Sequence, residues 1–421
     1  MRRAFRTRIP RIGLVVGFTI LLISRPAASE TTHSDLLALT REIGASVERI
    51  RGLRFAQSVK VAIVDDATAR SHFEQRAQKL WPADKIRHDE AALAQLGILP
   101  AGVEILPALL DVLEEQVGGY YDPEADAFYV LDDIPPDTAP ILMAHELTHA
   151  LDDQHFDIEA LLERVEQTDD QSTALAAVLE GSGTLVQTLY MMAEMRAGRL
   201  PQDLLRRISE SEAGQALKLR AAPEYLQRAL IAPYVLGPGF VLRGDPTGIG
   251  SRDIAADLNR VFQDPPRSTE QILHPEKYWS TEHRDDPVPI VFPDLAASLG
   301  PGWSLASMGR LGELNLAILT GGKAPDSASP SASTPGAWTT PGAEGLAGDV
   351  FHHYTDGQHR VSVLATLWDS ERDAQEFVEA LDAMPGRYVY HALDRVVLVG
   401  GDTSRPTELA AAAMTGLRSE P

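Results

Sequence analysis

The chain has 421 residues, 44% hydrophobic and 23% charged, so it can bury a sizeable core in one large domain or in two domains. It contains no cysteine, which excludes disulfides, iron–sulfur clusters, thiolate metal sites and thiol nucleophiles. The formal net charge of -22 repels nucleic-acid phosphates, and no basic stripe with interleaved aromatic residues is visible, so a nucleic-acid partner is not expected.

The first 29 residues have the order of an export signal. They carry six arginines and no acidic residue, and the apolar run 12–23 is followed by the small-residue stretch Pro26-Ala27-Ala28-Ser29. We therefore predict a signal peptide over residues 1–29 and a periplasmic or extracellular protein. The alternative is an uncleaved anchor, although the run is short beside the roughly 20 residues that span a bilayer. Membrane association is expected only through this segment, if it stays uncleaved.

Hydrophobic periodicity predicts a mostly helical region after the signal. Helices are expected over residues 34–53, 68–81, 91–116 (with a break near 97–100), 139–153 and 173–196, with further helical stretches in 202–230 and 252–262. A strand is expected over 58–64. Residues 117–121 and 127–131 flank the turn Asp122-Pro123-Glu124-Ala125-Asp126, a composition typical of a β-hairpin.

The C-terminal part reads as a small α+β unit. A helix over 305–319 leads into the loop 321–345, which is rich in Pro, Ser and Gly. Strands 350–354 and 361–367 flank an Asp356-Gly357 turn, and a helix over 370–384 precedes strands 388–392 and 396–399. We therefore divide the mature chain into a region 30–285 and a C-terminal unit 286–421.

The segment His145-Glu146-Leu147-Thr148-His149 lies inside the predicted helix 139–153. Its two histidines are four residues apart, so both imidazoles project from one helix face and can bind one Zn²⁺. Glu146 adjoins the first histidine, where it can take a proton from a metal-activated water without being a ligand. The alternative is an ordinary helix with two surface histidines. The apolar context of this helix favours the zinc site.

Either of two residues further along the chain, His155 or Glu180, can complete such a site as the third ligand. His155 follows His149 by six residues, the metzincin spacing, but Asp152 stands where metzincins place a turn-forming glycine. Glu180 follows His149 by 31 residues and is an isolated carboxylate in the otherwise uncharged run 172–193. A carboxylate in such a run needs a partner, and Zn²⁺ would be one. We favour Glu180 as the third ligand and keep His155 as the alternative.

Further segments accompany this motif, namely Tyr120-Tyr121-Asp122-Pro123, Glu180-Gly181, residues 268–278 and Trp368-Asp369-Ser370-Glu371. Together with residues 145–156 they resemble a family of uncharacterised exported zinc metallopeptidases of the gluzincin type. The resemblance covers most of the mature chain. It implies His145, His149 and Glu180 as zinc ligands and Glu146 as the catalytic carboxylate.

The chain departs from that family pattern at two places. Residues 345–349 stand where the family has an element like Gly-Trp-Gly-Asp, which affects only the C-terminal unit. Thr184 stands where many gluzincins place an aspartate that orients a zinc-bound histidine. The residue that orients the histidines is therefore unassigned, and Asp152 and Asp153 are the nearest carboxylates in sequence.

Three other side chains are candidates for contacts with the substrate or the transition state. His274 and Tyr278 lie in a proline-containing turn and could donate to an oxyanion, or they could simply pack that turn. Tyr120 lies in a possible edge strand before the zinc helix, where main-chain pairing could align a peptide. Its alternative is ordinary hairpin packing.

We therefore expect an α+β, mostly helical fold with a zincin-like metallopeptidase domain. The expected function is zinc-dependent hydrolysis of peptide bonds in a protein or peptide substrate, with Glu146 as general base and then acid. Two alternatives stay open: a zinc-stabilised envelope binding or chaperone protein that cuts nothing, and a zinc amidase that acts on cell-wall peptides.

Overall fold

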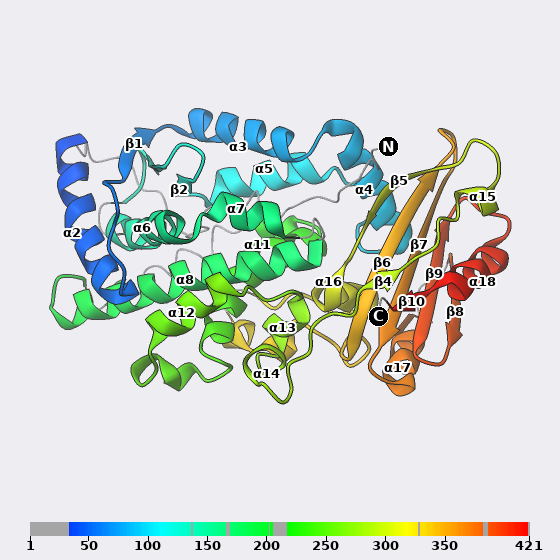
Figure 1. Cartoon of the computed structure of the whole chain (residues 1–421). Helices are drawn as coiled ribbons and strands as arrows, with labels where there is room; N and C mark the ends of the chain where they lie inside the picture. The colour runs from blue at the N-terminus through cyan, green and yellow to red at the C-terminus, as the bar shows by residue number, and fades with distance from the viewer. Residues whose placement is uncertain are drawn as a thin grey trace.

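The computed structural model describes residues 33–135, 138–165, 169–201, 203–204, 217–326, 329–381 and 386–419. The predicted signal peptide lies outside these residues. The fold is α+β, with a helical part at one end and a five-stranded sheet at the other (Figure 1). Within the described ranges, no helix combines the length and the apolar character that a membrane crossing needs.

The helical part follows the predicted order closely. Its helices are α2 (His33–Arg51), α3 (Asp66–Leu80), α4 (Ala83–Leu96), α5 (Ile105–Gln116), α6 (Ala139–Phe156), α7 (Ile158–Arg164), α8 (Asp169–Arg196), α10 (Leu217–Ala221), α11 (Glu224–Val241), α12 (Ile254–Gln263), α13 (Thr269–Leu273) and α14 (Glu276–Trp279). The predicted break in 91–116 is present, because Gly97 ends α4 with a left-handed φ of 95°. The predicted stretch 202–230 lies partly outside the described residues.

A three-stranded sheet covers one side of α6. Strands β2 (Gly119–Asp122) and β3 (Ala127–Leu131) form the predicted hairpin, and β1 (Lys60–Val64) pairs with β3 in parallel. The sheet order β1-β3-β2 leaves β2 at the edge that lies against α6. The hairpin therefore lies directly beside the helix that carries the two predicted zinc histidines.

Helix α8 runs through the helical part and packs against α6 on one side and α11 on another (Figure 1). Its contact with α11 is backbone to backbone. A Cβ added at Gly181 would lie 2.7 Å from the carbonyl carbon of Gly237, and one added at Gly237 would lie 2.1 Å from the carbonyl oxygen of Ala177. Only glycine fits at either position, so these two residues set the separation of α8 and α11.

The C-terminal sheet has the order β5-β6-β7-β9-β8 and is antiparallel throughout. Its strands are β5 (Ser304–Gly309), β6 (Leu346–Thr355), β7 (Arg360–Trp368), β8 (Arg387–Ala392) and β9 (Arg395–Gly401). The remaining elements near it are α15 (Ala296–Leu299), α16 (Gly312–Leu319), α17 (Glu371–Leu381), α18 (Pro406–Gly416), the short pair β4 (Ile290–Val291) and β10 (Arg418–Ser419), and the 3-10 turns η2 (Pro330–Ser333) and η3 (Pro335–Ala337); a further turn, η1 (Pro246–Gly250), lies in the helical part.

The predicted helix over 305–319 is wrong in its first part. Residues 304–309 form β5, which pairs with β6, and the helix begins only at Gly312. A short apolar run is compatible with either structure, and here pairing with a distant strand decides it. Helix α18 was not predicted.

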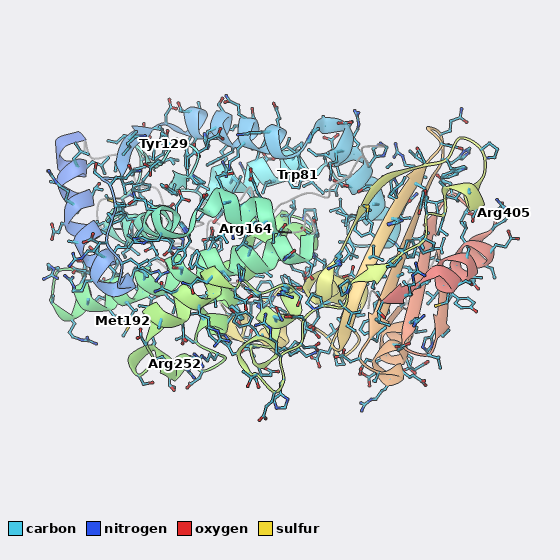
Figure 2. The ribbon with its side chains drawn as sticks, viewed as in Figure 1. Trp81, Tyr129, Arg164, Met192, Arg252 and Arg405 are labelled. Carbon is cyan, nitrogen blue, oxygen red and sulfur yellow. The ribbon has the colours of Figure 1, made fainter. Side chains whose placement is uncertain are left out.

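The two faces of this sheet bury alternate residues. Phe351, Leu364 and Leu398 face the core shared with α4 and α17, whereas Val363 and Val397 face the core shared with α18. Side chains fill the space between the helical part and the sheet, and Arg405, at the start of α18, lies on the far side of the sheet (Figure 2). The contact of α4 with the sheet joins the first quarter of the chain to its last third.

A buried carboxylate ties the sheet to the start of α16. Asp349 of β6 accepts hydrogen bonds from the backbone amides of Leu311 (2.6 Å) and Gly312 (3.1 Å) at the start of α16. Burial, reinforced by the neighbouring Asp170 carboxylate, raises the pKa of Asp349 to about 7. A carboxyl group whose pKa is higher in the folded than in the unfolded state loses its stabilising contribution as pH rises.

We predict that Asp349→Asn makes the free energy of unfolding less dependent on pH. Relative to this variant, the parent should lose on the order of 4 kcal/mol between pH 4 and pH 7, because its folded-state pKa of about 7 lies above the ordinary aspartate pKa of 3.8. Urea unfolding at pH 4, 5, 6, 7 and 8 measures the difference. The exposed Asp356, whose pKa is lowered to about 2, is the control, since Asp356→Asn should add no slope in this range. Parallel curves for Asp349→Asn and the parent would contradict the prediction.

Candidate metal centre

Three of the predicted ligands converge between α6 and α8. The Nε2 atom of His145 lies 3.0 Å from Oε2 of Glu180, and the Nε2 atom of His149 lies 3.5 Å from the same oxygen. One ligand atom from each residue lies within 4.8 Å of the others. His145, His149 and Glu180 are 0%, 4% and 1% exposed, so the group is closed to bulk water in this structure.

The charges of this group are strongly coupled. Burial lowers the pKa of His145. Burial alone would also lower the pKa of His149, but the Glu180 carboxylate reverses this and raises it to about 9. Burial opposes ionisation of Glu180, yet His149 and His145 together hold its pKa below the usual range. The arrangement is one carboxylate shared by two imidazoles, and its negative charge favours the positively charged form of His149.

The donor set fits Zn²⁺. Two nitrogens and one carboxylate oxygen are usual zinc ligands, and ligands about 2.0–2.2 Å from a tetrahedral ion lie roughly 3.3–3.6 Å apart. The separations of 3.0 and 3.5 Å from Glu180 are close to that range. The Nε2 atom of His149 is buried and makes no further hydrogen bond to the described residues. A buried nitrogen that has no hydrogen-bond partner within the protein is a suitable metal ligand, because a bound ion would satisfy it.

Glu146 is fully buried beside this group. Its Oε2 atom accepts a hydrogen bond of 2.8 Å from the backbone amide of Tyr121, in the edge strand β2. The hairpin therefore orients the carboxylate that the sequence predicts to be catalytic. The sequence analysis named the neighbouring Tyr120 as the candidate contact from this strand, whereas the hydrogen bond to Glu146 comes from the backbone amide of Tyr121.

Two residues near His145 were not predicted. A Cβ added at Gly183 of α8 would lie 2.5 Å from Nε2 of His145, so the imidazole needs a glycine at this position. Tyr234 of α11 stacks on the same imidazole, with 6.0 Å between ring centroids and 24° between ring planes. Gly183 is part of a Gly-Ser-Gly run visible in the sequence, but Tyr234 comes from a distant helix and gives no local signal.

A buried polar cluster lies next to the ligands and joins four helices. Asp152 of α6 accepts hydrogen bonds from Ser182 Oγ of α8 (2.6 Å) and from Arg51 Nε of α2 (2.7 Å). Arg51 also donates to Asn259 of α12 (2.7 Å), and its guanidinium lies 5.6 Å from the ring centroids of both Phe156 and Phe262, which stack on each other. Asp152 thus holds α6 against α8, although it does not bond either zinc histidine.

Asp153, the other candidate for orienting the histidines, points elsewhere. It accepts a hydrogen bond from the Tyr121 hydroxyl (2.7 Å) and one from the backbone amide of Ile158 (2.8 Å). Gln187 lies seven residues after Glu180, hence on the same face of α8, and its amide nitrogen is buried without a hydrogen bond to any described residue. Nδ1 of His145 is likewise buried without a hydrogen bond to any described residue, so neither Asp152 nor Asp153 orients this histidine.

The alternative ligand His155 does not join the group. Its Nε2 atom lies 2.8 Å from the backbone oxygen of Arg54, because this last turn of α6 faces the loop after α2. Tyr120 is buried and stacks against both His72 and Tyr129, with 4.9 Å to each ring centroid. The ring of Tyr120 therefore packs the hairpin.

His274 and Tyr278 also lie apart from the three ligands. His274 pairs with Glu313 of α16 at 3.0 Å, and the hydroxyl of Tyr278 donates to the backbone oxygen of Asp264 at 2.5 Å. Both side chains therefore fix their turn against neighbouring elements, which agrees with the structural alternative for these residues.

A second acidic group in this turn holds a lysine. Nζ of Lys277 donates to Glu270 (2.6 Å), Asp285 (2.9 Å) and Asp369 (3.2 Å), so three carboxylates already share one ammonium group. This group, which joins the turn to the end of β7, is not a second metal candidate.

Comparisons with known proteins bear only on the C-terminal part. A family model described as a domain of unknown function (DUF8575) matches residues 305–408, from β5 into the start of α18. No curated protein and no solved structure matches the chain significantly. The matched residues exclude all three converging ligands, so the match assigns no role to them.

We predict that Gly183→Ala abolishes tight zinc binding. The added methyl group would displace the His145 imidazole, and losing a ligand should cost more than the roughly 10–100-fold typical of losing a neighbouring hydrogen bond. Competition with a chromophoric chelator measures the affinity. Gly239→Ala in α11 is the matched control, because its added Cβ meets nothing within 4 Å. Equal zinc affinity in Gly183→Ala and the parent would show that His145 is not a ligand in this geometry.

Proposed function

We propose that the protein is an exported zinc-dependent metallopeptidase with a zincin-like catalytic region of the gluzincin type. The observation that carries the proposal is the buried convergence of His145, His149 and Glu180, with Glu146 beside them. The resemblance of the sequence motifs to exported gluzincin peptidases supports the same function. The export signal that the sequence predicts supports a periplasmic or extracellular location.

His145, His149 and Glu180 would hold the ion. Zn²⁺ bound there supplies a Lewis acid that activates water and polarises the carbonyl of a peptide bond. Glu146 would then take the proton of the attacking water and deliver it to the leaving amine. The hydrogen bond from Tyr121 leaves the carboxylate one fixed orientation for both steps. Exclusion of bulk water strengthens the electrostatic interactions among these groups.

The expected partner is a protein or peptide. Strand β2 is an edge strand, and the outward amide of Tyr121 points at Glu146. An extended peptide that displaces Glu146 from this amide and pairs with the edge would have its main chain beside the catalytic carboxylate. The net charge of -22 disfavours nucleic acid.

We predict that the zinc-loaded protein cleaves a disordered protein and that Glu146→Gln does not. The variant keeps all three ligands and should bind zinc normally, while its cleavage rate falls at least about 100-fold because the general base is lost. Cleavage is followed by mass spectrometry, and zinc content by atomic absorption. Glu163→Gln, at an exposed position of α7, is the control and should cleave at the parental rate.

Other outcomes separate the alternatives. If neither form cuts protein while both bind zinc stoichiometrically, general proteolysis is excluded. Release of peptides from purified peptidoglycan would then indicate an amidase, and the absence of any cleavage would favour a binding or chaperone role.

A further inference from the structure

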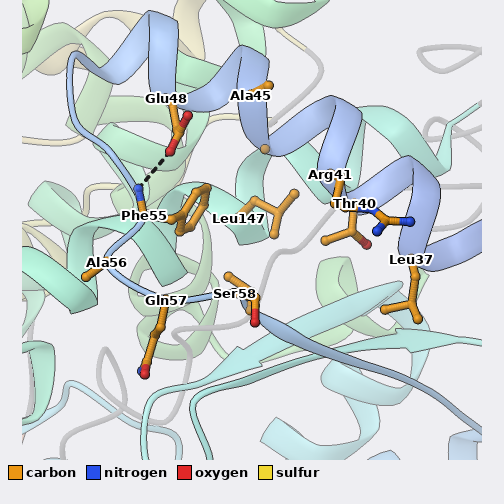
Figure 3. A pocket seen from close by; sticks show the side chains of 12 residues that line it. Leu37, Thr40, Arg41, Ala45, Glu48, Phe55, Ala56, Gln57, Ser58 and Leu147 are labelled. Carbon is orange, nitrogen blue, oxygen red and sulfur yellow. Dashed lines mark hydrogen bonds between the residues drawn. The ribbon is translucent and has the colours of Figure 1, made fainter.

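A cavity of about 540 Å³ lies between α2 and residues 55–59, with Leu147 of α6 on its floor (Figure 3). Its volume is within the range of about 300–1,000 Å³ typical of small-ligand sites. The cavity is on the side of α6 opposite to the metal ligands, since Leu147 lies midway between His145 and His149 in sequence. None of the residues that line it belongs to the candidate metal centre.

One face of α2 lines the upper side. Leu37, Arg41, Gly44, Ala45 and Glu48 recur at helical spacing, so they project toward the cavity together. Two of them are small, which leaves the space open. An added Cβ at Gly44 would already touch the Phe55 ring at 3.4 Å.

The rest of the lining is mainly apolar. Phe55 and Leu147 lie side by side in the middle of the cavity, and Leu37 lies toward one end (Figure 3). Ala56 and Val59 extend this surface toward β1. A ligand with an apolar body would therefore lose water against these side chains on binding.

The two charged side chains of the cavity, Glu48 and Arg41, differ in whether other residues bond them. Both carboxylate oxygens of Glu48 are engaged, one by the backbone amide of Phe55 (2.8 Å) and one by Arg54 (2.7 Å), so its charge is already balanced. The Thr40 hydroxyl donates to the backbone oxygen of Leu36. Arg41 makes no hydrogen bond or ion pair with any residue in the described part of the chain. Counting only the described residues, the cavity therefore presents one positive charge without a partner, beside an apolar wall.

We propose that this cavity binds a hydrophobic monocarboxylate. One planar guanidinium matches one carboxylate, with two parallel hydrogen bonds, whereas a phosphate group would call for more donors than the cavity offers. The apolar wall takes the aliphatic or aromatic body of the ligand. The proposal does not depend on the peptidase assignment, because none of the residues that line the cavity is a candidate metal ligand or the candidate catalytic carboxylate. It does place the ligand against α6, through Leu147.

The test is calorimetric titration of the purified protein with octanoate. We expect saturable 1:1 binding, with octan-1-ol at least about tenfold weaker because it cannot form the charge-assisted hydrogen bonds. Acetate, which has no apolar body, should not bind measurably.

Three variants locate the site. Arg41→Gln removes the charge at an exposed position that has no hydrogen bond or ion pair within the described ranges, and should weaken octanoate binding at least about tenfold. Ala45→Leu fills the cavity and should abolish binding. Arg49→Gln, on the same helix but outside the cavity, is the matched control and should bind like the parent. Thermal unfolding of each variant checks that the fold is intact.

Each contrary outcome overturns the proposal. The absence of saturable octanoate binding would do so, as would equal affinities for octanoate and octan-1-ol, or for the parent and Arg41→Gln. Binding of a peptide with a free C-terminal leucine, without binding of octanoate, would instead assign the cavity to a protein partner.

Discussion

The buried ion pair between Arg51 and Asp152 is the interaction on which the arrangement of the helical part depends. Both side chains are fully buried, so each charge needs the other, and removing one partner of such a pair typically costs about 3–5 kcal/mol. Through this pair and its hydrogen bonds to Ser182 and Asn259, helices α2, α6, α8 and α12 share one polar centre. The separation of α6 from α8 is thus fixed three residues beyond His149 and two residues beyond Glu180.

Four consecutive residues of helix α8, residues 180–183, each make a different contact that restricts the packing around the helix. Glu180, Gly181, Ser182 and Gly183 point in four directions around little more than one helical turn. In order, they meet the two histidines, the backbone of α11, Asp152 and the ring of His145. A helix that is contacted on all sides has no solvent face, which explains why charged residues are scarce in its middle. The isolation of Glu180 in that uncharged run was the signal that made it the preferred ligand.

Much of the helical part could be predicted from the sequence, because its helices are long and their ends carry recognisable signals. The hairpin and the segment 145–149 are local patterns, and the structure places them as expected. Residues 304–309 were misread because their partner strand begins 37 residues after they end. His274 and Tyr278 have side chains that suit catalysis, but Glu313 and the backbone of Asp264 engage them, and neither contact leaves a pattern in the nearby sequence.

The contact between α4 and the C-terminal sheet has a consequence for the order of synthesis. Residues 83–96 leave the ribosome long before residues 304–401, which form the sheet against which α4 packs. Ser307 and Ser362 of that sheet also bond Asp89 and Gln95 of α4. Until the sheet is made, this face of α4 stays uncovered in the nascent chain, and in a chain that ends at residue 285 it would never be covered. The helical part therefore reaches its final packing only when the last third of the protein has been translated.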